Sequence, residues 1–281
     1  MPIPPREDQA ADQGTGASPG APSSGAQLWA TRRSLLLGVA AAAVTGKLPA
    51  SAPQGSAAAD AESQIEAAEH EWLEIWKRGP TRVRWTSMPI QPGDKAPDLQ
   101  LADSSGSIVR FSDTWNRGPT IFVFLRHFGC SCARDRTARL KQEYAGYLAA
   151  GANVVAIGQG EPARARKFAL MHGLPCPLLC DPARRAYEAY GLLEGRPSQV
   201  VYGMPDEFLR CDVETGAEFQ SSRRGTQSAA VDNPFQLPGE FVVDPQGVLC
   251  LTYRSQYCAD FAEPQVLIAA IREARLGLKY G

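Results

Sequence analysis

The chain has 281 residues, a formal net charge of −1 and seven cysteines. Its near-neutral balance and scattered arginines argue against a broad basic surface, so we predict no nucleic-acid partner. The odd number of cysteines requires at least one thiol that is free or paired outside the chain.

The N-terminal region, residues 1–59, has the pattern of an export signal. Residues 1–29 are rich in Pro, Gly, Ser and Ala and are predicted to be disordered. Thr31–Leu37, TRRSLLL, resembles the twin-arginine export motif, and the apolar stretch Leu35–Val44 is too short for a permanent membrane anchor. Ala57–Ala59 has the small-residue form of a cleavage site. We therefore predict a bacterial protein exported to the periplasm or the medium; the alternative is a chance Arg pair before an Ala-rich helix.

Residues 60–90 are predicted to form one helix and a linker that precede the main domain. The helix, over 61–77, ends at Gly79-Pro80. Its apolar residues recur at helical spacing and are expected to lie against the main body: Ile65, Ala68, Trp72 and Ile75.

The main domain, residues 91–281, alternates predicted strands and helices. In chain order these are a hairpin of 99–102 with 108–111, a strand 120–125, a helix 133–150, a strand 153–157, a helix 161–173, a strand 177–180, a helix 181–191, a hairpin of 240–244 with 248–254, and a helix 264–276. A strand, helix and strand without a tight turn imply parallel pairing through a right-handed crossover. We predict an α/β domain with a mixed central sheet, helices on both faces, and an irregular insertion over 192–236.

The segment Thr120–Arg134, TIFVFLRHFGCSCAR, carries the chemistry. A buried strand ends shortly before Cys130, which stands at the expected first turn of a helix. The partial positive charge of a helix N-terminus and the nearby Arg126 favour a thiolate. The segment predicts an ionised, solvent-reachable nucleophile at Cys130; the alternative is a buried, inert cysteine.

A second thiol, Cys132, is the first candidate to resolve an oxidised Cys130. A disulfide between residues two apart closes a small, strained ring, which suits a transient bond. The alternative is that Cys132 lies on the first helical turn without a redox role. Cys211 and Cys258 lie outside the predicted elements and are further candidates for a disulfide or a resolving role.

The sequence is compatible with three roles for the His127 side chain. It orients or deprotonates a thiol, or it is a satisfied side chain beneath the loop. Together with Cys130 and Cys132 it also supplies soft ligands for copper(I) or zinc, so a metal carrier is an alternative function.

Several ordered blocks between residues 90 and 275 resemble the peroxiredoxin-like branch of the alkyl hydroperoxide reductase/thiol-specific antioxidant (AhpC/TSA) family. They are GDKAPD at 93–98, RHFGC at 126–130, VVAIGQG at 154–160, PLLCDP at 177–182, QLPGEFVVD at 236–244 and YRS at 253–255. The resemblance implies a thioredoxin-like fold, a redox-active Cys130, and substrate contacts at Gly129 and Pro238. It further implies a cis bond before Pro238, the alternative being an ordinary trans proline at a strand start. Arg254 is expected to reach the site and hold a peroxide or a carboxylate; the alternative is that its side chain is solvated.

The active-site segment also differs from the family pattern. Typical members carry P-x-x-x-T/S-x-x-C, whereas Val123 and His127 occupy the first two of these positions relative to Cys130. Many members of the branch carry C-x-x-C, where this chain has Ala133 at the second cysteine position.

The resemblance and the thiol site together predict an exported thiol-dependent oxidoreductase that reduces hydroperoxides or exchanges disulfides. Its partners are a small hydroperoxide or disulfide and an external thiol reductant. No organic cofactor is expected, because no glycine-rich phosphate loop stands at a strand–helix turn. Besides the metal carrier, a non-catalytic scaffold that binds a partner through 192–236 is the other alternative.

Overall fold

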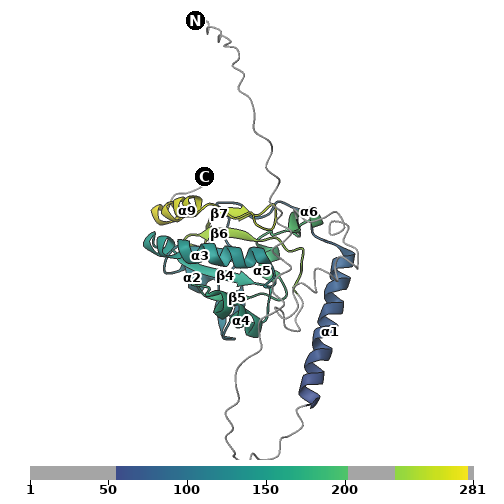
Figure 1. The fold of residues 1–281 in the computed structure, drawn as a ribbon. Helices are drawn as coiled ribbons and strands as arrows, with labels where there is room; N and C mark the ends of the chain where they lie inside the picture. The colour runs from purple at the N-terminus through teal and green to yellow at the C-terminus, as the bar shows by residue number, and fades with distance from the viewer. Residues whose placement is uncertain (1–54, 202–231, 278–281) are drawn as a thin grey trace, which may run out of the picture. The chain divides into compact units, whose positions relative to one another are not determined.

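A computed structural model describes residues 55–201 and 232–277 (Figure 1). The twin-arginine motif and its apolar stretch, most of the insertion and Cys211 lie outside the described residues, whereas the predicted cleavage site Ala57–Ala59 lies within the first helix, Gly55–Arg78. The described residues all fall within one unit of the chain, 53–281.

Seven strands form one mixed sheet in the order β2-β1-β5-β4-β3-β6-β7. The strands are β1 (Gln100–Asp103), β2 (Ile108–Arg110), β3 (Thr120–Phe124), β4 (Asn153–Gly158), β5 (Leu178–Cys180), β6 (Gly239–Val243) and β7 (Leu249–Arg254). β3 is parallel to β4 and antiparallel to β6, and all five of its residues are buried. A strand that is apolar on both faces belongs in the centre of a sheet, which is where β3 lies.

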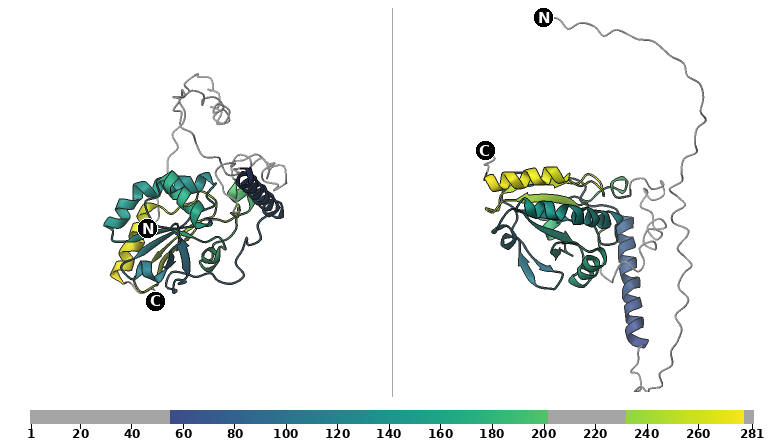
Figure 2. Two further views of the ribbon diagram at one scale, coloured as in Figure 1. Left: turned by 90° about the horizontal axis from the view of Figure 1, so that it is seen from below. Right: turned by 60° about the vertical axis from the view of Figure 1, so that its left-hand side comes forward.

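Helices cover both faces, and alternate residues of β3 separate the two cores. Ile121 and Val123 join the core beneath α3 (Ser131–Ala149), α4 (Pro162–His172) and α9 (Pro264–Leu276). α3 and α9 lie side by side on that face (Figure 1 and Figure 2).

The opposite face of the sheet has an aromatic core. Phe122 and Phe124 pack there against α2 (Ser112–Trp115) and α5 (Arg185–Ala189). The mixed sheet with helices on both faces is confirmed, and the parallel β3–β4 pair and the antiparallel β6–β7 hairpin give the predicted thioredoxin-like fold.

The N-terminal helix α1 (Gly55–Arg78) is anchored by two tryptophans near its C-terminal end. Trp72 and Trp76 are fully buried, and the Trp76 ring stacks on Phe235 with ring centroids 5.2 Å apart. Gly79, at φ 76°, ends the helix as predicted. Trp72 belongs to the predicted apolar stripe, but Trp76 rather than Ile75 is the second buried anchor. Within the described residues no helix combines the length and apolar character needed to span a membrane.

The described ends of the insertion are more ordered and more buried than an irregular loop. A short helix, α6 (Pro197–Val200), follows Gly195. Val200, Val201, Phe235 and Leu237 form a small core with the two tryptophans of α1. The segment 232–237 therefore packs as part of the domain body rather than as a surface loop.

Candidate active site

Cys130 lies at the junction that the sequence predicts. The chain leaves β3 at Phe124, and Cys130 is the N-cap residue of α3, with φ −78° and ψ 136°. Its Sγ accepts a hydrogen bond from the backbone N–H of Cys132 at 3.3 Å. A sulfur in the N-cap position meets both a free N–H group and the positive end of the helix dipole, which favour a negative charge there.

Arg126 adds a fixed positive charge. Its Nη1 donates to Cys130 Sγ at 3.2 Å and to the carbonyl of Val200 at 3.4 Å. Nε donates to the carbonyl of Gln236 at 3.2 Å, and Nη2 donates to that of Pro234. Only 2% of Arg126 is exposed. Three backbone carbonyls thus hold the guanidinium in place without neutralising it, so its charge acts on the sulfur.

Three thiols meet beside this guanidinium. Cys130, Cys132 and Cys258 belong to one apolar core cluster and are 7%, 9% and 4% exposed. Cys132 is hydrogen-bonded to Cys130 on one side and to Cys258 on the other. The Cys258 N–H donates to the carbonyl of Gln199 at 2.8 Å, which holds the third thiol against α6.

The three thiols differ in how readily they lose a proton. The hydrogen bond with Cys132 and burial raise the pKa of Cys130 well above its ordinary value, although Arg126 opposes them. At Cys132 the hydrogen bond with Cys130 lowers the pKa, but the bond to Cys258 and burial leave it raised. The hydrogen bond from Cys132, helped by Arg126, lowers the pKa of Cys258. In the reduced cluster the first thiolate therefore forms on Cys258.

The expectation of an ionised and solvent-reachable Cys130 is therefore wrong, although its position at a helix start is right. The sulfur is buried because α6 and the segment 232–237 cover the loop that carries it. Gly129, before Cys130, is half-buried, and Ser131, after it, is exposed.

A buried ion pair fixes the covering segment. Asp232 accepts two hydrogen bonds from Arg164 of α4, both 2.7 Å long, and a third from the backbone N–H of Phe128 at 3.0 Å. The side chains of Arg164 and Asp232 are 6% and 0% exposed. Sequence reasoning missed this pair, because nothing in the local pattern around residue 164 or 232 indicates that they meet.

His127 is fully buried, and its backbone carbonyl accepts a hydrogen bond from the N–H of Cys130 at 2.9 Å. Its role as a base stays a prediction. In the part of the chain that the structure describes, no three His, Cys, Asp or Glu side chains are arranged to hold a metal ion. The metal-carrier alternative therefore has no geometric support.

Pro238 lies next to the site but differs from the prediction. It directly precedes Gly239, which pairs with Phe124 at the end of β3. Across residues 55–201 and 232–277 every peptide bond is trans, so the predicted cis bond before Pro238 is wrong. The Leu237 N–H donates to the carbonyl of Leu193, and the Pro238 carbonyl accepts from Ser255, so hydrogen bonds with neighbouring segments hold the chain on both sides of this bond.

Arg254 does not reach Cys130, which corrects the expected catalytic role. Its Nε donates to the carbonyl of Tyr190 at 3.0 Å, and Nη2 donates to that of Ile90 at 2.6 Å. The guanidinium lies 5.3 Å from the ring centroid of Phe241, in the aromatic core opposite the thiols. The side chain projects from the other face of the sheet, because neighbouring residues of a strand alternate between faces.

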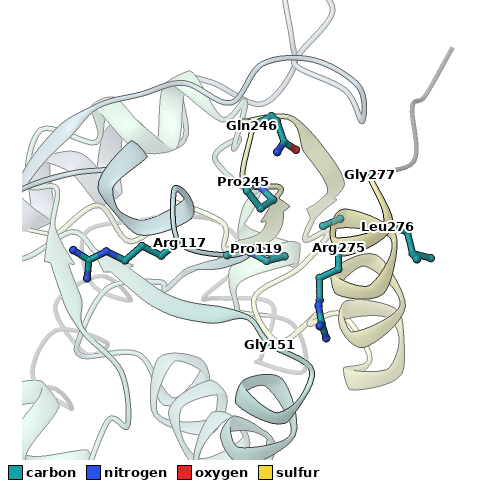
Figure 3. A pocket seen from close by; sticks show the side chains of 10 residues that line it. Arg117, Pro119, Gly151, Pro245, Gln246, Arg275, Leu276 and Gly277 are labelled. Atoms are coloured by element: carbon teal, nitrogen blue, oxygen red, sulfur yellow. The ribbon is translucent and has the colours of Figure 1, made fainter.

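A cavity of about 460 Å³ lies elsewhere (Figure 3). It is lined by Pro119, at the start of β3, and by Arg275 near the end of α9. The thiols follow the opposite end of β3, so this cavity is separate from the thiol site.

Comparison with known proteins adds a family assignment. The model of the AhpC/TSA family matches residues 92–251. Rv2521 of Mycobacterium tuberculosis, named as a candidate peroxiredoxin, is 30% identical over 102 residues, covering 36% of this chain and 64% of its own. Peroxiredoxin-like 2C of Bos taurus is 27% identical over 152 residues, covering 53% of this chain and 65% of its own. The chain thus matches less than two thirds of either relative's length.

Among solved structures, Peroxidoxin BcpB from Mycobacterium tuberculosis aligns with a TM-score of 0.47 and 17% identity. The alignment covers 65% of this chain and 97% of that one.

Proposed function

The chain belongs to the AhpC/TSA family, and from that premise we propose that it is a thiol-dependent oxidoreductase that reduces small hydroperoxides at Cys130. The observation that carries the proposal is the position of the Cys130 sulfur, which accepts hydrogen bonds from both Arg126 and the first turn of α3. These two donors stabilise a thiolate at this atom once its proton has moved to a neighbouring sulfur.

The proposed reaction has two steps on the protein. The Cys130 thiolate attacks the terminal oxygen of R–O–OH, the O–O bond breaks, and the sulfur becomes a sulfenic acid while R–OH leaves after protonation. Cys132 then attacks the Cys130 sulfur, forming a disulfide and releasing water. An external dithiol returns both cysteines to the thiol form and is itself oxidised to a disulfide, which balances the two electrons taken by the hydroperoxide.

Exchange with disulfide substrates is a second candidate activity at the same site. The hydrogen-bonded row of thiols favours it, because thiol–disulfide exchange needs an attacking thiolate in contact with a second sulfur.

The test is hydroperoxide consumption by the purified protein with dithiothreitol as reductant. We expect Cys130→Ser to lose activity to the background rate. Without dithiothreitol, Cys132→Ser should consume one equivalent of hydroperoxide and stop at the sulfenic acid, which dithiothreitol then reduces. Cys180→Ser, which changes a buried thiol on β5, is the matched control and should retain activity. Equal hydroperoxide and disulfide turnover by native protein and Cys130→Ser would exclude both activities at this site and favour a non-catalytic scaffold.

We also propose that the protein is exported through its twin-arginine motif, supported by Arg32-Arg33 and the short apolar stretch after them. In a bacterial host, replacing both arginines by lysine should retain the chain in the cytoplasm with its first 59 residues uncleaved. Recovery of processed protein from the periplasm with both lysines in place would contradict this.

A further inference from the structure

We propose that Cys258 is the third redox thiol of the site and receives the oxidation from a Cys130–Cys132 disulfide by attacking the sulfur of Cys132. This inference rests on the proposed function and extends it with a residue far along the chain. The product is a Cys132–Cys258 disulfide, which an external dithiol then reduces.

The topology places Cys258 beside the active loop. Gly239 of β6 pairs with Phe124 of β3 on one side and with Arg254 of β7 on the other. The end of β7 therefore lies at the same edge of the sheet as the end of β3, and Cys258, in the chain after β7, packs in the same core cluster as Cys130 and Cys132.

Hydrogen bonds hold the loop that carries Cys258. The Cys258 N–H and the Gln256 carbonyl both bind Gln199 of α6, at 2.8 and 2.7 Å. Within the loop, the Asp260 carboxylate accepts from the Gln256 N–H at 2.7 Å, and Ser255 Oγ donates to the Asp260 carbonyl at 2.6 Å. A loop fixed at this many points keeps the sulfur in contact with Cys132 without a large rearrangement.

Charge assigns the roles within the cluster. Arg126 interacts electrostatically with all three sulfurs. The hydrogen bond from Cys132, helped by Arg126, outweighs burial and lowers the pKa of Cys258, so this thiol ionises most easily. Its hydrogen bond is with Cys132, whereas Cys130 acts on it only through charge. Cys258 is thus the nucleophile, Cys132 the sulfur that is attacked, and Cys130 the leaving group.

The exchange step balances without another reagent. The Cys258 thiolate forms a bond to Cys132, the Cys130–Cys132 bond breaks, and Cys130 leaves as a thiolate. The departing charge meets Arg126 Nη1 and the Cys132 N–H, which already contact that sulfur. A stabilised leaving group and the opening of a small, strained ring both favour the exchange.

The exchange has a stoichiometric consequence. It regenerates the Cys130 thiolate while Cys132 and Cys258 remain oxidised, so a second hydroperoxide converts Cys130 to a sulfenic acid that dimedone traps. Without Cys258, the Cys130–Cys132 disulfide leaves no thiol at position 130, and the reaction ends after one equivalent.

The experiment treats the reduced full chain with excess cumene hydroperoxide and dimedone, without reductant, and maps the peptides by mass spectrometry. We expect native protein and the control Cys180→Ser to contain a Cys132–Cys258 disulfide and dimedone on Cys130. Cys258→Ser should contain a Cys130–Cys132 disulfide and no dimedone on Cys130. Cys258→Ala, with a different replacement side chain, should give the same result as Cys258→Ser. If neither variant folds, the disulfide found in native protein still tests the proposal.

The inference is overturned if native protein gives only a Cys130–Cys132 disulfide and matches Cys258→Ser in stoichiometry. Oxidised glutathione in place of the hydroperoxide separates this result from a failure of the proposed function. If the hydroperoxide does not react but glutathione disulfide yields the Cys132–Cys258 pair in native protein and not in Cys130→Ser, the peroxidase proposal fails and the transfer from Cys130–Cys132 to Cys258 stands.

Discussion

At the scale of single residues, the charge of Arg126 acts on all three sulfurs of the site. Burial alone would lower its pKa, but attraction to the sulfurs of Cys130, Cys132 and Cys258 more than offsets this and leaves the pKa raised. The guanidinium therefore stays charged and lowers the free energy of any thiolate in the cluster.

Replacing Arg126 should make every thiol of the cluster harder to ionise. We expect Arg126→Met to shift the thiolate absorbance at 240 nm to higher pH by about 1–3 units, because an opposite charge at this distance has that effect. Arg126→Lys, which keeps the charge but loses the fork of donors, should shift it less. The exposed Arg139→Met is the control, and a titration of Arg126→Met that coincides with it would show that the charge does not act on the thiols.

The pH dependence of thiol reactivity should report Cys258. Its pKa is lowered below the ordinary value of 9.0, so the thiolate fraction, and with it the rate of reaction with a small disulfide, rises with pH and reaches half of its maximum below pH 9. In Cys258→Ser the remaining thiols, Cys130 and Cys132, have raised pKa values, so the rise should move to higher pH. Stopped-flow rates between pH 5 and 10 measure this, and an unchanged profile would assign the first thiolate to another cysteine.

At the scale of secondary-structure elements, the covering segment 232–237 connects three parts of the molecule. It contributes two carbonyls to Arg126, a carboxylate to Arg164 of α4, and the Phe235 ring to α1. The burial of the thiols and the attachment of α1 therefore depend on the same few residues.

The ion pair of Arg164 with Asp232 should be costly to break from one side. Asp232→Asn leaves a buried guanidinium uncompensated, so we expect the free energy of unfolding to fall by about 3–5 kcal/mol in urea denaturation. The exposed pair of Asp135 and Arg139, 3.4 Å apart on one helix, is the matched control, and Asp135→Asn should cost less than about 1 kcal/mol. Similar losses in the two variants would mean that water reaches the buried pair.

Trp76 should contribute most of the attachment of α1. Trp76→Ala removes a fully buried ring that stacks on Phe235, and we expect a loss of about 3–5 kcal/mol in the free energy of unfolding. Glu74→Ala on the exposed side of the same helix should have little effect. Equal stability of the two variants would show that α1 is not part of the folded domain in solution.

At the scale of the whole molecule, the three sulfurs that interact with Arg126 in the described part of the chain lie at one edge of the sheet. Burial raises the pKa of Cys176 and of Cys180 to about 12. Among the described residues, neither thiol forms a hydrogen bond with Arg126 or with the thiol cluster. These two thiols pack as small apolar side chains.

Alkylation of the native protein should therefore be selective. At pH 8 we expect iodoacetamide to label Cys258 first, while Cys176 and Cys180 stay unmodified until the chain unfolds in urea. Peptide mass spectrometry at increasing times measures this order. Labelling of Cys180 as fast as Cys258 in folded protein would contradict it.

The local features of the site were predictable because each has a short-range cause. An apolar run followed by helix-forming residues was enough to place β3, α3 and the N-cap position of Cys130. The parallel β3–β4 pair followed from the crossover rule, and the ordered family blocks indicated the fold.

Long-range features were predicted less well. The segment that carries Arg254 was expected to reach the thiol site. The alternation of side chains along β7 instead directs the Arg254 side chain into the aromatic core on the opposite face of the sheet. Cys258 was one of two further candidates, with Cys211, for a disulfide or a resolving role. Only the pairing of β6 with β7 brings it to Cys132.

The amino-acid order alone was sufficient for the strand–helix junction, the cysteine at its helix start and the family, because these depend on neighbouring residues and on ordered motifs. Tertiary structure decided which thiol ionises first, how deeply Cys130 is buried and which distant groups reach it. Those properties depend on local dielectric, on backbone carbonyls that any residue carries, and on contacts between segments more than a hundred residues apart, as between Arg126 and Gln236.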